Sequence, residues 1–156
     1  MKTESRGIAL IKSYEKLVLT AYHGEADPPN IWTIGWGHTF GVKEGMVIDQ
    51  QTAEVLLEQD ISDAEDAVAG SANLSITTQA QFDAMVSFAF NLGTGAFKRS
   101  TLLRMHNSGD FFGAGQQFQR WVFANGQKRR GLFLRRSYEA ALYAEDRFLE
   151  YKPEEG

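Results

Sequence analysis

The spacing of apolar residues predicts mixed helix and strand in the first part of the chain. Between residues 4 and 14, apolar side chains recur at the interval of one face of an α-helix. The segments 17–22 (LVLTAY) and 31–36 (IWTIGW) are rich in β-branched and aromatic residues, which is typical of strands. Gly24 and the Pro28-Pro29 pair mark a turn between them. We therefore expect a helix followed by a small β-hairpin.

A long segment with the apolar periodicity of an α-helix follows the hairpin. Residues 46–48 could add a short third strand, and Asp49 is well suited to cap the N-terminus of a helix. After Asp49, apolar residues fall on one helical face as far as about Ala69. Gly70 is a stop signal. This pattern predicts one long helix between the two parts of the chain.

The remainder of the chain has only helical patterns. Residues 78–81 (TQAQ) match a capping box. The segment 82–92 that follows is apolar around most of its circumference, which indicates a buried central helix, and Gly93 closes it. Shorter helices are expected at about 101–107, 111–119 and 131–145.

These elements predict a single α+β domain over residues 1–156, a length sufficient for one buried core. We expect a small N-terminal lobe with a short β-sheet (about 1–49), a connecting helix (about 50–70) and a larger all-helical C-terminal lobe (about 71–156). The tail at 152–156 is expected to fray. A cleft between the two lobes is the expected place for a ligand site.

Composition narrows the functional classes. Hydrophobic residues make up 43% of the chain and there is no cysteine. The chain is therefore expected to fold as a globular protein, without disulfides, a thiol nucleophile or thiolate metal sites. The three histidines, His23, His38 and His106, show no metal-binding spacing. Charged residues interrupt the first twenty positions, so we expect no signal peptide, and no membrane span follows.

Charge is distributed unevenly along the chain. Residues 1–70 hold 5 Lys and Arg against 12 Asp and Glu, whereas residues 71–156 hold 11 against 8. The acidic total and the absence of a binding motif disfavour nucleic acid as a partner. A basic patch near the C-terminus could attract an anionic polymer, or it could be a solvated helix start. It consists of Lys128, Arg129, Arg130, Arg135 and Arg136.

Three residues of the first lobe could together hydrolyse a glycosidic bond. Glu15 lies at the C-terminal end of the first helix, where the negative pole of the helix dipole favours the protonated carboxyl that a general acid needs. Asp27 lies in an exposed turn and could activate water, and Thr33 on the next strand could hold that water. Each has an ordinary alternative: surface pairing with a lysine for Glu15, turn formation for Asp27 and β-propensity for Thr33.

Longer motifs around these residues resemble a known family. The segment TIGWGHT at 33–39, preceded by a Glu and an Ala-Tyr pair, resembles the active-site segment of the phage-type lysozymes, glycoside hydrolase family 24. Residues 82–103 resemble the central helix of that family and the turn after it, and residues 118–142 resemble the C-terminal region of its lambdoid-prophage branch. The resemblance covers roughly residues 4–145 and implies a lysozyme-like fold.

The resemblance also implies roles for individual residues. Glu15, Asp27 and Thr33 match the catalytic Glu, Asp and Thr of the family. Gly37 matches a glycine whose backbone binds an N-acetyl group, and Phe97 matches an aromatic residue at the rim of the cleft.

Two further assignments come from the resemblance. The turn at 23–29 is longer than in the T-even phage lysozyme, so Glu25 competes with Asp27 for the role of the second carboxylate. His38 and Asp60 match a structural, non-catalytic ion pair of the family.

The implied protein is an endolysin that hydrolyses the β-1,4 bond between N-acetylmuramic acid and N-acetylglucosamine in peptidoglycan. It would act as a monomer without cofactor or metal and without inserting into a membrane. It would be made in the host cytoplasm and reach the wall through a holin pore. Three alternatives stay open: a lytic transglycosylase, a non-catalytic wall-binding or membrane-disrupting protein acting through residues 128–136, and a secreted antibacterial effector.

Overall fold

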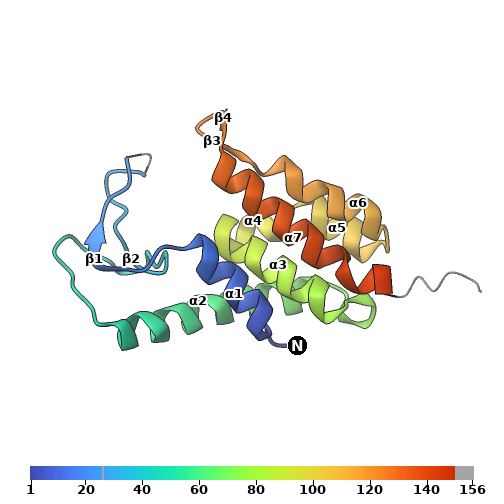
Figure 1. The fold of residues 1–156 in the computed structure, drawn as a ribbon, viewed down its shortest axis with the longest axis horizontal. Helices are drawn as coiled ribbons and strands as arrows, with labels where there is room; N and C mark the ends of the chain where they lie inside the picture. Colours follow the sequence, from blue (N-terminus) through green and yellow to red (C-terminus); the bar gives the residue numbers. More distant parts are fainter. Residues whose placement is uncertain (26, 150–156) are drawn as a thin grey trace, which may run out of the picture.

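The computed structural model describes residues 1–25 and 27–149, with side chains as far as Glu145, and it has an α+β fold that is mostly helical with a small sheet (Figure 1). The expectation for the tail at 152–156 lies outside the described residues. In chain order the elements are α1 (Ser5–Tyr14), β1 (Val18–Tyr22), β2 (Thr33–Gly35), α2 (Gln50–Ser71), the 3-10 helix η1 (Leu74–Ile76), α3 (Gln79–Leu92), α4 (Thr94–Lys98), α5 (Thr101–Asn107), α6 (Phe111–Gln117), the 3-10 helix η2 (Phe118–Arg120), β3 (Phe123–Ala124), β4 (Gln127–Lys128) and α7 (Arg130–Leu149).

The small sheet of the N-terminal lobe is an irregular antiparallel pair. Strand β1 pairs with β2 in a register that shifts between its two ends, where Val18 lies opposite Gly35 and Tyr22 opposite Thr33. The expected strand at 46–48 is an isolated bridge rather than a strand of the sheet. Strand β2 is shorter than predicted because the chain turns back directly after it.

That turn is closed by two backbone hydrogen bonds. The amides of Ile34 and His38 each donate to the other's carbonyl, both at 2.9 Å. Gly35 and Gly37 lie inside the turn at φ +66° and +75°, a region that residues with a Cβ rarely adopt. The glycines of the TIGWGHT segment therefore end the strand and reverse the chain.

Helix α2 joins the two lobes and begins at the predicted N-cap. The Asp49 side chain accepts a hydrogen bond from the Thr52 amide at 2.7 Å. Its apolar face is buried at Ala53, Leu57 and Ile61, among others. The helix continues to Ser71, past the predicted stop at Gly70, because a helical glycine costs only about 1 kcal/mol and packing offsets it.

Helix α3 is the centre of the C-terminal lobe, as its apolar pattern predicts. Its capping box is formed: the Thr78 hydroxyl accepts from the Gln81 amide, and the Gln81 side chain accepts from the Thr78 amide. The helix packs against α1, α2 and α7. In Figure 1 it lies between α2 and α7, and α7 begins at the end of the C-terminal lobe that is nearer the N-terminal lobe and runs away from it. No helix within the described ranges is long and apolar enough to cross a membrane.

Candidate active site

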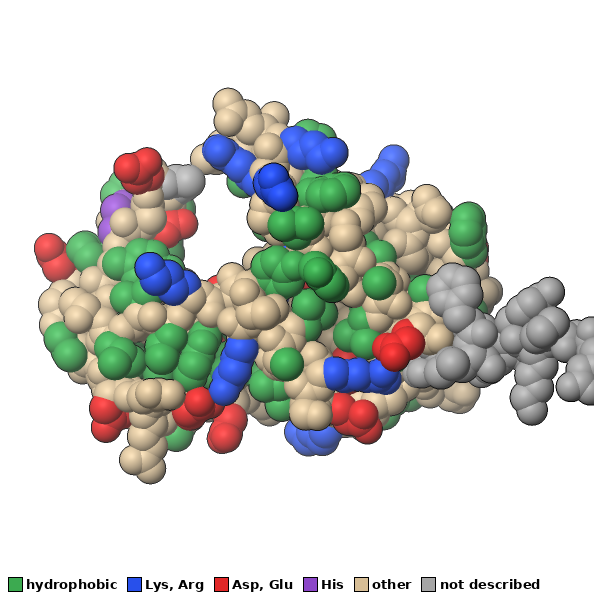
Figure 2. All heavy atoms as spheres, viewed as in Figure 1, with side chains coloured by type: hydrophobic (Ala, Val, Ile, Leu, Met, Phe, Trp, Pro, Cys, Tyr) green, Lys and Arg blue, Asp and Glu red, His purple; other side chains and the backbone are tan. Residues whose placement is uncertain are grey.

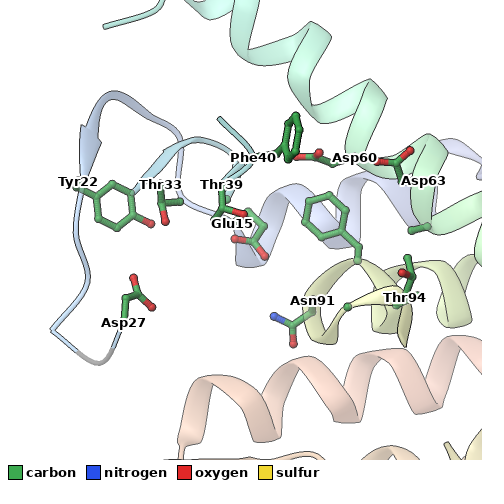
Figure 3. Close-up of a pocket in the computed structure, with 15 residues that line it drawn as sticks. Glu15, Tyr22, Asp27, Thr33, Thr39, Phe40, Asp60, Asp63, Asn91 and Thr94 are labelled. Atoms are coloured by element: carbon green, nitrogen blue, oxygen red, sulfur yellow. The ribbon is translucent and has the colours of Figure 1, made fainter. Parts of the chain in front are cut away.

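A cleft of about 420 Å³ lies between the sheet of the N-terminal lobe and the helices α2, α3 and α4 (Figure 3). Both lobes contribute residues to this cleft, which lies where the sequence analysis expected a ligand site. It is lined by Glu15, Tyr22, Asp27, Thr33, Gly37, Thr39, Phe40, Asp60, Asp63, Ala64, Ala89, Phe90, Asn91, Gly93 and Thr94.

Glu15 projects into the cleft from the end of α1. It is the C-cap residue of that helix, with extended backbone angles, and its amide still donates to the Ile11 carbonyl at 3.0 Å. One carboxylate oxygen lies against the backbone of Gly37: a Cβ added there would be 2.8 Å from Glu15 Oε2. The glycine therefore leaves room for the carboxylate, in addition to turning the chain.

Arg135 holds the same carboxylate from the other lobe. Its Nη1 donates to Glu15 Oε1 at 2.9 Å, and its own side chain is almost fully buried. Lys12, an expected partner of Glu15, instead pairs with Glu54 at 3.0 Å. The alternative in which Glu15 is a surface glutamate paired with a neighbouring lysine is therefore wrong.

The basic patch proposed from the sequence also needs correction. Arg135 and Arg136 are buried, not exposed, and both pair with the buried Glu139. Arg135 Nε lies 3.2 Å from Glu139 Oε1, Arg136 Nε lies 2.8 Å from Oε2, and the Ser87 hydroxyl donates to Oε1 at 2.7 Å. Arg136 and Arg135 precede Glu139 by three and four residues, the spacing at which side chains pair on one face of a helix. This signal was present in the sequence and was missed.

Burial dominates the electrostatics of this cluster. It raises the pKa of Glu139 even though Arg136, Arg135 and Ser87 all act in the opposite direction. It lowers the pKa of Arg136, against the attraction of Glu139. Arg136 also donates to Asn91 Oδ1 at 2.8 Å, and Asn91 lines the cleft. The cluster thus contacts two residues that line the cleft: Arg135 holds Glu15, and Arg136 holds Asn91.

Asp27 faces the cleft from the long turn of the N-terminal lobe. Its carboxylate accepts from the Gly24 amide at 3.1 Å and its own amide donates to the Gly24 carbonyl at 3.0 Å, which closes the turn. In Figure 3 its carboxylate and that of Glu15 point into the same space. Glu25 is exposed and is not among the residues that line the cleft. This placement favours Asp27 over Glu25.

Thr33 and Tyr22 lie beside the two carboxylates. They are opposite each other in the sheet, and Thr33 is buried to 7% exposure. Burial raises the pKa of the Tyr22 phenol, and the negative charges of Glu15 and Asp27 raise it further. Tyr22 therefore lies within the electrostatic influence of both carboxylates, at an exposed edge of the cleft.

The structure contains the ion pair that the resemblance implied behind the turn. His38 Nδ1 lies 2.8 Å from Asp60 Oδ2, and His38 Nε2 lies 2.9 Å from the Phe40 carbonyl oxygen. The pair fastens the TIGWGHT turn to α2. Asp60 also lines the cleft, so the pair lies at its edge.

Phe97 is not at the rim of the cleft, which corrects the prediction. Its side chain has no exposed surface and packs with its ring centroid 6.4 Å from that of Phe88 in the core of the C-terminal lobe. Of the aromatic residues in α3 and α4, the one that lines the cleft is Phe90, near the end of α3. Phe90 is half-buried and also packs against the core, so the all-round apolar pattern did not distinguish it. Within the described residues, no group of three or more His, Cys, Asp and Glu could hold a metal ion.

Comparison with known proteins gives a consistent set of relatives. The profile of the family described as Phage lysozyme matches residues 12–139. The endolysin of Acyrthosiphon pisum secondary endosymbiont phage 1 is 40% identical, with 92% of this chain and 98% of that protein covered. The endolysin of Bacillus phage B103 is 41% identical over 92% of this chain and 54% of that protein, so the chain spans about half of that relative.

The solved structures agree. The muramidase domain of SpmX from Asticaccaulis excentricus matches with a TM-score of 0.81 and 38% identity, over 91% of this chain and 97% of that one. The two-lobed fold and these relatives define a lysozyme, a glycoside hydrolase that degrades peptidoglycan. Within this class, the chain belongs to the phage lysozyme family.

Proposed function

We propose that the chain hydrolyses the β-1,4 bond between N-acetylmuramic acid and N-acetylglucosamine, with Glu15 and Asp27 as its two catalytic carboxyl groups. The observation that carries this proposal is the convergence of Glu15, Asp27 and Thr33, from a helix end, a turn and a strand, on one cleft. Glu15 protonates the leaving oxygen, and Asp27, assisted by the Thr33 hydroxyl, directs water at the anomeric carbon.

The surroundings of Glu15 suit the role of a positioned acid. Arg135 fixes one carboxylate oxygen, and the other lies against Gly37. A group held from two sides loses little orientational freedom when the substrate binds, which is how positioning contributes to rate. The Gly37 backbone is also open to the cleft, where it can hydrogen-bond an N-acetyl group of the sugar.

Glutamine and asparagine variants test the assignment. We expect Glu15→Gln and Asp27→Asn each to lower the rate of sacculus hydrolysis by about 10²- to 10⁴-fold, the usual contribution of an acid or base. Glu25→Gln is the matched control because it removes an exposed turn carboxylate outside the cleft lining, and it should keep full activity. A Glu15→Gln variant that lyses permeabilised cells like the wild type would support the non-catalytic, wall-binding alternative instead.

The products separate hydrolysis from transglycosylation. A lytic transglycosylase lets a hydroxyl of the substrate attack, and its muropeptides carry an anhydro end. The presence of Asp27 and Thr33 in the cleft beside Glu15 favours water as the nucleophile. Mass spectrometry of the digest should therefore show hydrated ends, and anhydro-muropeptides would contradict the proposal.

The setting of the reaction is also a proposal. We expect the chain to act as a monomer on one glycan strand, after release to the wall through a holin pore. We also expect the N-terminal lobe to end at about residue 49 and the connecting helix to end at about residue 70. Sedimentation of the purified chain should give the mass of a single copy, 17.5 kDa. Lysis from within that needs a co-expressed holin would support this route, and lysis without one would contradict it.

A further inference from the structure

Strands β3 and β4 form a hairpin with a very short loop. They pair antiparallel, and the last pair before the loop joins Ala124 and Gln127. The loop consists of Asn125 and Gly126, whose φ angles are 51° and 73°. Both angles suit the type I′ turn of a two-residue hairpin loop. In the described part of the chain, Asn125 is the one residue other than glycine that has a positive φ.

This loop is open to solvent. Asn125 and Gly126 are both exposed, and a Cβ added at Gly126 would meet nothing within 4 Å. Figure 1 shows the hairpin projecting from the end of the C-terminal lobe, and Figure 2 shows the same projection in a space-filling view. Water therefore reaches the Asn125 side chain and the Gly126 backbone.

The two loop residues carry groups that can react with each other. A backbone nitrogen that follows an asparagine can attack the carbonyl carbon of the asparagine side chain, because the product is an unstrained succinimide ring. A side chain on the following residue hinders this approach, and Gly126 has none. The cross-strand pair beside the loop joins Ala124 and Gln127, so the Gly126 nitrogen is outside the ladder.

The other asparagines of the chain lack this combination. Each is followed by a residue that has a side chain. Three of them also have side chains that accept hydrogen bonds, namely Asn73, Asn91 and Asn107. Within the described residues, no such hydrogen bond is formed by the Asn125 side chain.

Asn30 is the best comparison within the same molecule. It is exposed as well, in the long turn before β2. The next residue, Ile31, is β-branched, and its amide donates to the Pro28 carbonyl at 2.9 Å. The nitrogen that would have to attack Asn30 is therefore both shielded by a side chain and engaged in a hydrogen bond.

We propose that Asn125 is a site of spontaneous deamidation, in which the Gly126 nitrogen attacks the Asn125 side chain. The nitrogen gives up its proton to solvent and bonds to the side-chain carbonyl carbon, and the side-chain amide takes up a proton and leaves as ammonia. Water then opens the succinimide ring. The sum of the steps consumes a water molecule and releases ammonia, and nothing is oxidised or reduced. No substrate takes part, so the proposal is independent of the proposed function.

The ring can open in either of two ways. Attack of water at the former side-chain carbonyl gives aspartate, which adds a negative charge and still tolerates a positive φ. Attack at the former backbone carbonyl gives isoaspartate, in which the main chain runs through the side-chain methylene. The longer loop no longer fits a type I′ turn, so isoaspartate should open the β3–β4 ladder, whereas aspartate should preserve it.

Peptide mapping of the full chain tests this proposal. The purified protein is kept at mildly alkaline pH for several weeks, digested with trypsin and analysed by mass spectrometry. A sample taken at the start corrects for deamidation during digestion. Trypsin places Asn125 in the peptide 121–128 and Asn30 in the peptide 17–43, so the two sites are read separately. An isoaspartyl methyltransferase labels the isoaspartate fraction.

Asn125 should convert to both products. Its rate in the folded protein should be within about tenfold of the rate in guanidinium chloride, because loop tips open locally at little cost in free energy. Asn30 should show no measurable conversion over the same period. Gly126→Ala should slow the conversion in guanidinium chloride, where the fold has no influence, because the added methyl group hinders the attack.

Two results would overturn the proposal. Conversion in guanidinium chloride without conversion in the folded protein would show that the hairpin protects Asn125. Equal conversion of Asn125 and Asn30 in the folded protein would show that neither the glycine nor the exposed loop selects the site.

Discussion

The carboxylate of Glu15 has two close neighbours that determine its position. Arg135 holds one oxygen by a hydrogen bond, and the bare Cα of Gly37 leaves space for the other. Each neighbour comes from a different part of the chain, one from a turn of the N-terminal lobe and one from the last helix. The position of the Glu15 carboxylate thus depends both on the missing Cβ of Gly37 and on the guanidinium of Arg135.

Replacing Gly37 with alanine should abolish activity while the protein still folds. The new Cβ would lie 2.8 Å from Glu15 Oε2, so the carboxylate must move, and a φ of +75° adds roughly 1–2 kcal/mol of strain. We expect a loss of at least about 10²-fold in kcat, measured on sacculi, because the acid is displaced.

Gly41→Ala is the matched control for that variant. Gly41 has a similar φ of +71°, but a Cβ there would have open space around it. It should therefore show comparable destabilisation in urea unfolding and nearly full activity. Equal inactivation of the two variants would mean that backbone strain, and not the collision with Glu15, explains the loss.

At the scale of elements, helix starts and the short helix at 101–107 were predictable, whereas the shortest segments were not. Asp49 and Thr78 mark the starts of α2 and α3 through contacts with residues three positions away, so the sequence alone reveals them. The hairpin at 123–128 and the five-residue helix α4 have too few residues for a periodic signal. The β3–β4 turn is Asn-Gly, a recognisable hairpin signal that was overlooked.

The same distinction applies to the site. Glu15, Asp27 and Thr33 lie within one short segment, so their spacing could be compared with a family pattern. Arg135 reaches Glu15 from 120 residues away, and only the tertiary structure brings them together. Phe97 was assigned to the rim only by the family resemblance, and its burial in the core could not be seen from the sequence. Phe90 was overlooked because a helix that is apolar all round gives no indication of which aromatic side chain faces the cleft.

The N-terminal segment before α1 is fastened to α2, and this contact should depend on pH. The Thr3 amide donates to Glu65 Oε1 at 2.7 Å, and the Lys2 ammonium to Oε2 at 3.0 Å. Burial acts to raise the pKa of Glu65, but the hydrogen bonds from Thr3 and Lys2 together hold it below its ordinary value of 4.5. The stabilisation is therefore present above pH 4.5 and is lost as the pH falls through the folded-state value.

Thermal unfolding of the wild type and Glu65→Gln between pH 3 and 7 measures this effect. The wild type should have the higher Tm at neutral pH, and the difference should shrink steadily below about pH 4.5, where the unfolded carboxyl takes up its proton. A constant difference across the range would show that Glu65 contributes through packing instead of its charge.

At the scale of the whole molecule, the cluster around Glu139 connects the core of the C-terminal lobe to Glu15, the proposed catalytic acid, in the other lobe. Arg135 is shared between the two glutamates, at 2.9 Å from Glu15 and 3.2 Å from Glu139. Its removal leaves Glu139 buried with one cation fewer and Glu15 without its interlobe partner. Stability and activity should therefore both depend on this one side chain.

Arg135→Gln should lower the free energy of unfolding by about 3 kcal/mol, the cost of breaking a buried pair, and lower kcat at least tenfold. Arg135→Lys keeps the charge but cannot form the same fork of hydrogen bonds, so it should recover stability more than activity. Urea unfolding and sacculus hydrolysis, each assayed at one temperature where all variants are folded, separate the two effects. Full activity in Arg135→Gln would show that Glu15 needs no partner from α7.

The interlobe contact has a consequence for synthesis. Arg135 and Glu139 are translated after Glu15, 120 and 124 positions later. A nascent chain on the ribosome, or a product truncated before α7, contains Glu15 and Asp27 and still lacks Arg135. If Glu15 is the catalytic acid, such a fragment should hydrolyse sacculi more slowly than the full chain, because nothing from α7 holds the carboxylate.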